Sequence, residues 1–488
     1  MINLLLVFCL VLLARHASGM PYRVPLHGEI GGKRTLVILD DMARVPAHSI
    51  FFGNLAESGH ELSYFQSTSP ELKIKKYGVS LYDNIIMLNA DEMNTITFQH
   101  ITDFVEEGGN VLVAVDGVVS DAMRAFAESC GIDFDRKGSQ VLDHFSYEAS
   151  VDTRYVACLF LGLSLLFSSL LTPPPHSLQH SAVVSYNAIK SSVVLGKYLD
   201  LSSSKQGVIF EGIGHAVDDK NILALKVLRG NSGTYSANPA KAIDDYPENA
   251  GGDTLLVTGV QARNNARMIF SGSTSLFSNA FFSTTLASGE VAANEVFTQE
   301  LSQWVFGQSG VLRFRDITHH KSDGTPPDVI LHEKERPDLP QSLYPDPEIT
   351  RNSLVYRIKD EIVYSMVVEE SVNGEWKPFA SNDMQLEFVM LDPHVRKTMT
   401  ADPKTGKFVA TFTAPDNYGI FKFRVLYRRP GYSVLHAETH VSIRPFKHNE
   451  YERFIFSAYP YYSSAISATV AFFIFSVAFL GATKEKKK

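Results

Sequence analysis

The stretch GKRTLVILDD at residues 32–41 predicts how the N-terminal half of the chain folds. Its uninterrupted apolar centre is typical of a strand that is covered on both faces, as strands of parallel sheets are. Two further runs, YDNIIMLN at 82–89 and VLVAV at 111–115, have the same character. Segments with helical spacing lie between these runs, at 50–58 and in a stretch that starts after Thr97. This alternation of strands and helices predicts an open parallel α/β sheet of the flavodoxin-like kind.

The α/β pattern returns farther along the chain, and we assign residues 20–317 to one α/β region. Apolar strand patterns lie at 254–259 and 267–272, and a helical pattern follows at 294–306. Residues 318–350 are polar and rich in Pro and Asp, which predicts a linker or a long irregular connection.

Residues 351–446 have a period of two instead. Phe421, Phe423 and Val425, for example, alternate with basic residues. Turn signals of the Asn-Gly, Thr-Gly and Pro-Gly types separate such segments. The pattern predicts an antiparallel β-sandwich of the Ig-like class.

The two ends of the chain predict a membrane protein. The apolar run LLLVFCLVLLA near the start is too short to span a bilayer and precedes small residues, which predicts a signal peptide at 1–19. Residues 463–482 are uncharged and long enough for a transmembrane helix. An interfacial aromatic belt precedes this helix and consists of Tyr459, Tyr461 and Tyr462.

A lysine-rich tail at 483–488 follows the predicted span. Because cationic flanks stay on the cytosolic side, the chain is predicted to be single-pass type I, with its bulk in the lumen. Lys484 and Lys486 lie fifth and third from the carboxyl terminus. This spacing fits a dilysine retrieval signal, although simple anchoring of the span explains the same lysines.

The composition excludes several classes of function. With 45 basic and 53 acidic residues, the net charge of −8 does not favour nucleic acid as a partner. Three cysteines are too few for a disulfide framework or a four-thiolate zinc site. The length of 488 residues corresponds to about three domains at roughly 150 residues each.

Few residues suggest chemistry. Asp40 and Asp41 end the first strand at the edge where open α/β sheets bind ligands, but no nucleophile or base adjoins them in sequence. The other candidates each lack a second group that their chemistry needs, and we expect them to be structural or solvated. They are Asp133 and Asp135 in DxD spacing, Cys130, Ser273 after a strand, and His319 with His320. The sequence therefore predicts no catalytic, cofactor-binding or metal-binding residue.

Several segments are more specific than a fold pattern. Together with residues 32–41, they resemble the family of the forty-eight-kilodalton subunit of the oligosaccharyltransferase complex. The segments are VQARNNARMIFSGSTSLFSNAFF (260–282), SQWVFGQSGVLRF (302–314), QLEFVMLDPHVR (385–396), DNYGIFKFRVLYRRPGYS (416–433) and YERFIFSAYPYY (451–462). The resemblance covers nearly the whole mature chain except about 154–181. It implies an amidotransferase-like N-terminal sheet without that enzyme's nucleophile.

The resemblance implies a non-catalytic accessory subunit in the endoplasmic reticulum membrane. The complex transfers a preassembled glycan from dolichyl diphosphate to Asn in N-x-S/T sequons. The implied partners are the polytopic catalytic subunit, the ribophorins and the small DAD subunit, and no cofactor is implied. Two alternatives stay open: an enzyme with a cryptic carbohydrate site at Asp40 and Asp41, or a lumenal cargo receptor or chaperone of the same topology.

Residues 154–181 are anomalous, because they place the apolar block YVACLFLGLSLLFSSLL (155–171) inside the α/β region. A second span here would put the sandwich in the cytosol and the terminal lysines in the lumen, against the positive-inside tendency. A buried lumenal helix is a further alternative. We interpret residues 154–181 as a retained intron, since removal of the stretch joins Asp152 and Thr153, through one residue, to a strand like that of the family at 182–184.

Overall fold

The computed structural model describes residues 32–90, 93–148, 180–191, 193–196, 206–239, 246–331, 352–372 and 374–482. Several predictions fall outside these residues. They concern the signal peptide at 1–19, nearly all of the apolar block at 154–181, most of the connection at 318–350, and the tail at 483–488 with Lys484 and Lys486.

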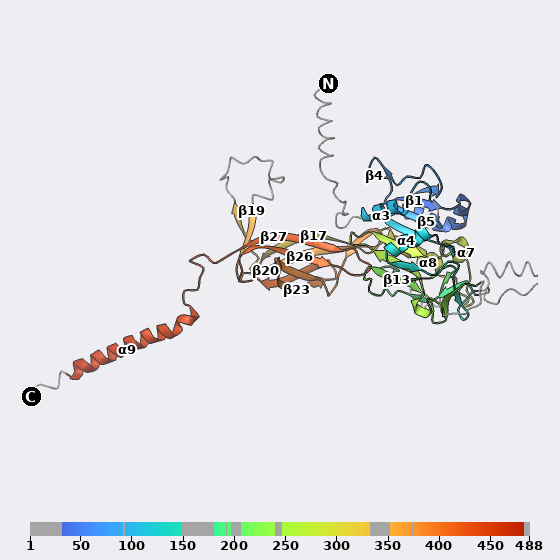
Figure 1. Ribbon diagram of the computed structural model, residues 1–488. Coiled ribbons are helices and arrows are strands. Elements are labelled where there is room, and N and C mark those ends of the chain that lie inside the picture. Colours follow the sequence, from blue (N-terminus) through green and yellow to red (C-terminus); the bar gives the residue numbers. More distant parts are fainter. Residues whose placement is uncertain are drawn as a thin grey trace, which may run out of the picture.

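The N-terminal part is built on a ten-stranded mixed sheet (Figure 1). Five parallel strands lie in the order β2–β1–β5–β6–β16, which is the 2-1-3-4-5 order of flavodoxin-like sheets. Their bounds are β1 Arg34–Leu39, β2 Glu61–Gln66, β5 Asn84–Leu88, β6 Asn110–Ala114 and β16 Arg267–Ser271. The predicted open α/β sheet is confirmed.

The prediction of a wholly parallel sheet is wrong on one side, where five further strands pair antiparallel. They are β7 Ile132–Phe134, β10 Asn187–Ala188, β12 His215–Val217, β13 Ala224–Arg229 and β15 Leu255–Gln261. Only residues 262–266 join β15 to β16. This connection allows a hairpin but not the crossover that a parallel pair needs, so the two strands pair antiparallel.

Helices cover both faces of the sheet. Val37 and Leu39 of β1 point into a core that includes α2 and α8, whereas Leu36 and Ile38 point into a second core with α3 and α4. Because the side chains of β1 alternate between the two cores, this one strand stabilises both helical layers. Each fully buried side chain of this kind contributes about 1.5–3 kcal/mol. The helices are η1 Met42–His48, α2 Ser49–Glu57, α3 Phe98–Glu106, α4 Asp121–Ser129, η3 Gly251–Asp253, η4 Ser275–Phe277, α7 Asn279–Phe282 and α8 Asn294–Val305.

Three two-stranded sheets flank this core. They pair β3 Lys75–Lys76 with β4 Val79–Ser80, β8 Gln140–Asp143 with β14 Thr234–Ala237, and β9 Val183–Ser185 with β11 Val208–Phe210.

Two sheets enclose a single core in the C-terminal part. One contains β17 Val311–Lys321, β20 Glu361–Val372, β21 Glu375–Pro378, β24 Thr400–Asp402 and β25 Lys407–Thr413. The other contains β18 Asp328–Leu331, β19 Asn352–Arg357, β22 Gln385–Met390, β23 Asp392–Thr398, β26 Gly419–Tyr427 and β27 Leu435–Arg444. We call this pair of sheets the sandwich. Phe421, Phe423 and Val425 all point into its core, as their alternation predicts.

The sandwich differs from the prediction in two respects. First, β19 and β27 pair parallel, which the alternation of side chains cannot reveal because it is the same in both kinds of pair. Second, residues 318–321 and 328–331 belong to β17 and β18 although their composition resembles that of a connection. The polar side chains of 318–321 are compatible with a strand because they are exposed or only partly buried.

A junction centred on Arg267 joins the sandwich to the α/β part. The Arg267 side chain is only 2% exposed and donates hydrogen bonds to four carbonyl oxygens. They belong to Trp304 (2.6 Å), Ser309 (2.7 Å), Gly310 (2.8 Å) and, in the turn between β26 and β27, Gly431 (3.3 Å). The guanidinium also lies 5.0 Å from the centre of the Trp304 ring, and the Trp304 indole donates to the Gly431 carbonyl at 2.8 Å.

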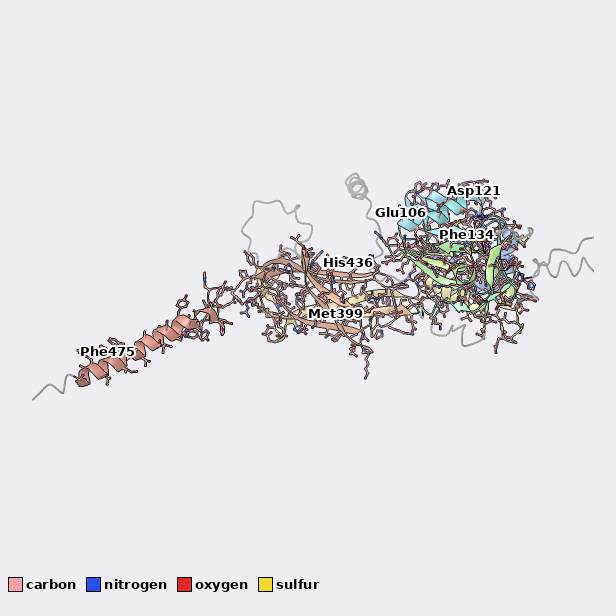
Figure 2. The ribbon with its side chains drawn as sticks, turned by 60° about the horizontal axis from the view of Figure 1, so that its bottom comes forward. Glu106, Asp121, Phe134, Met399, His436 and Phe475 are labelled. Carbon is pink, nitrogen blue, oxygen red and sulfur yellow. The ribbon has the colours of Figure 1, made fainter. Side chains whose placement is uncertain are left out.

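The three parts of the chain follow one another along an extended molecule (Figure 1). The α/β part lies at one end and the sandwich in the middle. The helix α9 Tyr459–Ala482, preceded by η6 Phe456–Ala458, projects at the other end. Figure 2 shows this arrangement from another side, with Phe475 on the projecting helix, Met399 and His436 on the sandwich, and Phe134 in the α/β part.

Candidate functional site

Polar side chains meet at the carboxyl edge of the parallel strands. Asp40 follows β1, Asn89 follows β5 and Asp116 follows β6, while Thr274 follows β16. Because β1 lies between β2 and β5, the chain reverses its direction of winding there, and open α/β sheets bind ligands at such a switch point. This crevice is the natural place to look for a site.

An internal ion-pair network occupies the crevice. Arg44 of η1 bridges two carboxylates, with its Nη2 atom 3.1 Å from Asp40 Oδ2 and its Nη1 atom 3.3 Å from Asp116 Oδ2. Asn89 Nδ2 donates to Asp40 Oδ2 at 3.2 Å, and Thr274 Oγ1 donates to Asp116 Oδ1 at 2.5 Å. The network ties together segments that follow four different strands, and its two carboxylates share one guanidinium, which leaves a net charge of −1.

The structure separates the predicted carboxylate pair of Asp40 and Asp41. Asp41 is exposed and is the N-cap of η1, since its Oδ1 atom accepts from the Ala43 backbone N–H at 3.0 Å. An oxygen that caps a helix satisfies a backbone donor that would otherwise have none. Asp40 alone therefore belongs to the crevice.

Arg44 and Asp116 are crevice residues that the sequence reasoning missed. Arg44 lies four residues after Asp40 in the DDMAR motif, a spacing at which opposite charges pair on one turn. Asp116 follows the VLVAV run just as Asp40 follows the first strand. The signal for Arg44 was its spacing from Asp40, and the signal for Asp116 was its position after an apolar run.

Two hydroxyl groups adjoin the crevice, but neither is placed to attack a substrate. The Ser273 side chain is fully buried, and its Oγ atom accepts from the Leu276 backbone N–H at 3.2 Å. Thr274 is also buried, and its hydroxyl is committed to Asp116. A nucleophile must reach the reacting atom, so these positions support structure and not chemistry.

His48 lies under the crevice and was not singled out from the sequence. The ring is buried, and its Nδ1 atom lies 3.0 Å from the Phe277 carbonyl oxygen, so this nitrogen carries the proton. Burial lowers the pKa of His48, which keeps the ring neutral at physiological pH. This histidine anchors η1 to the helical layer below it.

The remaining sequence candidates are dispersed. Asp133 is exposed, whereas Asp135 is buried and hydrogen-bonded to Asn249, and burial raises the pKa of Asp135. His319 contacts the Tyr356 hydroxyl at 2.7 Å, while the adjacent His320 contacts the Lys321 carbonyl.

Cys130 is partly buried beside Met268, and burial raises the pKa of its thiol, which leaves it unreactive at neutral pH. Among the described residues, no group of three or more His, Cys, Asp or Glu side chains could hold a metal ion.

A concavity of about 360 Å³ lies between α2 and the edge strand β2. Its lining is mainly apolar and includes Phe52, Leu62 and Tyr64. His60 also lines it, but one ring nitrogen lies 3.1 Å from Thr35 Oγ1 and the other lies 2.8 Å from Gln308 Nε2. Both nitrogens of this ring are therefore occupied within the fold.

The C-terminal segment Phe456–Ala482 is the one helix among the described residues that is long and apolar enough to cross a membrane. The predicted aromatic belt residues Tyr459, Tyr461 and Tyr462 lie in the first turn of α9, and all three are exposed. Such a position suits rings that lie at the level of lipid headgroups.

Comparison with known proteins matches nearly the whole chain. The sequence model described as the OST48 N-terminal domain matches residues 27–163 and 173–308, and the model described as the OST48 middle domain matches 344–483. The chain is 37% identical over 474 residues to the dolichyl-diphosphooligosaccharide–protein glycosyltransferase 48 kDa subunit of Danio rerio, covering 95% of each chain. Proteins of the same name in Drosophila melanogaster (36%; 93% of this chain, 94% of that one) and Arabidopsis thaliana (33%; 92% of each) are similarly related.

Proposed function

The chain belongs to the family of the dolichyl-diphosphooligosaccharide–protein glycosyltransferase 48 kDa subunit, and we propose that it is a non-catalytic scaffold subunit of that enzyme. Its role is thus in protein N-glycosylation, the transfer of a preassembled glycan to asparagine. The proposed location is the endoplasmic reticulum membrane, with type I topology and α9 as the single span.

The proposal of a non-catalytic role rests on the arrangement of side chains at the crevice. At the position where an open α/β sheet binds a ligand, the Arg44 guanidinium pairs with both Asp40 and Asp116 and orients the two carboxylates. The two neighbouring hydroxyl groups are buried and engaged. A transfer site needs polar groups that are free to contact the substrate. Here the polar groups pair with one another and connect the ends of neighbouring strands.

The candidate span supports the same conclusion. Residues 463–482 contain no charged side chain, whereas a site for a dolichol-linked donor calls for polar or ionisable groups at membrane depth. We therefore assign the transfer chemistry to a polytopic partner subunit, with ribophorin-type and small DAD-type subunits as further partners. The α/β part and the sandwich, which we place in the Ig-like class, would form the lumenal scaffold.

The variant Asp40→Asn with Asp41→Asn tests the proposal. Because both carboxylates are at least partly exposed, their neutralisation costs at most about 1 kcal/mol of stability. We expect the assembled complex to glycosylate an acceptor peptide at the wild-type rate. Co-isolation with the polytopic subunit is the control for assembly.

A carbohydrate-processing site at Asp40 is the second candidate function. It is favoured by one observation, the partial exposure of Asp40 beside Asn89 at the switch point. Loss of transfer in a fully assembled complex that carries the double variant would support this candidate and contradict the scaffold proposal.

A further inference from the structure

Three exposed apolar side chains lie together at one end of the sandwich. Leu391, in the turn between β22 and β23, is 99% exposed. Tyr418 and Ile420, at the start of β26, are 69% and 70% exposed. The two segments touch, because a Cβ atom at Gly419 would lie 2.9 Å from the sulfur of Met390. We call Leu391, Tyr418 and Ile420 the apolar tip.

The chain leaves the sandwich toward α9 at this same end. Lys359, in the turn between β19 and β20, lies 3.4 Å from Asp416 and 5.9 Å from the ring of Phe446. Asp416 precedes Tyr418 by two residues, and Phe446 follows the last strand by two. The exit of the chain and the apolar tip are thus connected by direct contacts.

The connection from the sandwich to α9 is short, because its first half is fixed to the sandwich. Arg444 forms an ion pair with Glu450 at 2.6 Å, and the rings of Phe446 and Tyr451 lie 5.4 Å apart. Only residues 452–455 remain between Tyr451 and the start of η6 at Phe456. Five extended steps reach about 17 Å, so η6 begins within that distance of Tyr451.

The backbone at Leu391 is an independent sign that this side chain has a role. Its φ of 61° lies in the left-handed region, which costs free energy for a branched residue. A glycine or asparagine would relieve that strain, and full exposure of the leucine gives no compensating burial within the chain. An apolar surface that covers the tip would give the leucine this burial.

We propose that the apolar tip inserts into the interfacial layer of the same bilayer that α9 spans, so that this end of the sandwich contacts the membrane. The inference rests on the proposed spanning role of α9. Phe454, Phe456 and Tyr459, just before and at the start of α9, are exposed as well, and their side chains suit the same layer.

The charges around the tip indicate a zwitterionic surface as the partner. Lys359 pairs with Asp416, and Arg444 pairs with Glu450 at 2.6 Å, so the ion pairs at this end balance their signs. A phosphatidylcholine surface presents both signs at the same depth, whereas an anionic surface would call for an excess of cations.

Tryptophan scanning of the full-length chain tests the proposal. Leu391→Trp is compared with Leu426→Trp in vesicles of phosphatidylcholine with brominated acyl chains, which quench indole emission on contact. Leu426 is a matched control, since it is 50% exposed on β26 and six residues beyond Ile420, about 20 Å farther from the tip. Phe475→Trp reports whether α9 is in the bilayer, and the emission of the unsubstituted chain is subtracted.

We expect quenching and a blue shift at position 391 and no change at position 426. Quenching at 475 but not at 391 would overturn the docking of the tip while leaving the span intact. Equal quenching at 391 and 426 would show that the sandwich lies along the membrane and would also overturn the proposal. Failure to quench at 475 would remove the span itself and, with it, the premise of the docking.

Discussion

Replacing Arg267 with methionine is the most direct test of the junction between the α/β part and the sandwich. The change keeps most of the apolar stem but removes all four hydrogen bonds to carbonyl oxygens and the contact with the Trp304 ring. Arg313→Met is the matched control. The Arg313 guanidinium also lies over a tryptophan, 3.9 Å from the Trp376 ring, but it is only partly buried and paired with Glu369.

We expect Arg267→Met to lower the free energy of unfolding by about 2–4 kcal/mol. The Ser309 carbonyl loses the donor that the structure gives it, and an unsatisfied buried carbonyl costs about 1–3 kcal/mol. The lost contact with Trp304 adds about 1–2 kcal/mol. Burial lowers the pKa of Arg267 to about 9, so removing this buried charge recovers part of the loss. The Arg313 control loses a partly exposed ion pair and a partly exposed ring contact, which together should cost about 1–2 kcal/mol.

Equilibrium unfolding of the full-length chain in mild detergent measures both variants. The chain contains two tryptophans, Trp304 in the α/β part and Trp376 in the sandwich, so its emission follows both parts. The unsubstituted chain should unfold in one transition, and Arg267→Met should separate the two parts. If Arg267→Met and Arg313→Met lose the same small amount, the buried arginine does not hold the junction.

Three further predictions concern acid sensitivity, retrieval and the apolar block. Burial lowers the pKa of His215 to about 3, so below pH 6.5 only the unfolded chain takes up this proton, and unfolding becomes easier by about 1.4 kcal/mol per pH unit. His215→Gln should reduce the slope of unfolding free energy against pH by that amount between pH 4 and 6 and leave it unchanged above pH 7. Changing Lys484 and Lys486 to serine should release an unassembled reporter from the endoplasmic reticulum, and continued retention would show that another signal holds it. Transcript sequencing should find that the dominant message lacks the codons for 155–180, and their presence would contradict the retained-intron interpretation.

The sequence predicted those elements whose burial is decided locally. The run at 111–115 is apolar throughout, and β6 is indeed buried between two helical layers. The parallel pairing of β19 with β27 was not predictable in the same way, because strand alternation does not specify the direction of a neighbour. The antiparallel pairing of β15 with β16 was missed although the sequence holds a signal for it, since a connection of only five residues allows a hairpin and not a crossover.

The candidate site was predictable only in its location. Two carboxylates after an apolar strand marked the correct edge of the sheet, but the separate tasks of Asp40 and Asp41 depend on how η1 begins. The junction gave no signal at all. Arg267 opens a strand, and its acceptors are backbone carbonyls as distant as Gly431, so no side-chain pattern in the sequence reveals them.

The junction also has a consequence for the order of events during synthesis. Gly431 lies 164 residues after Arg267, so the ribosome adds those residues before the fourth acceptor exists. At about 5–20 residues per second this takes roughly 10–30 s, far longer than a small domain needs to collapse. For that time Arg267 and Trp304 both lack one acceptor, the Gly431 carbonyl oxygen. The hydrogen bonds of Arg267 and Trp304 are therefore complete only after the turn that contains Gly431 has been synthesised.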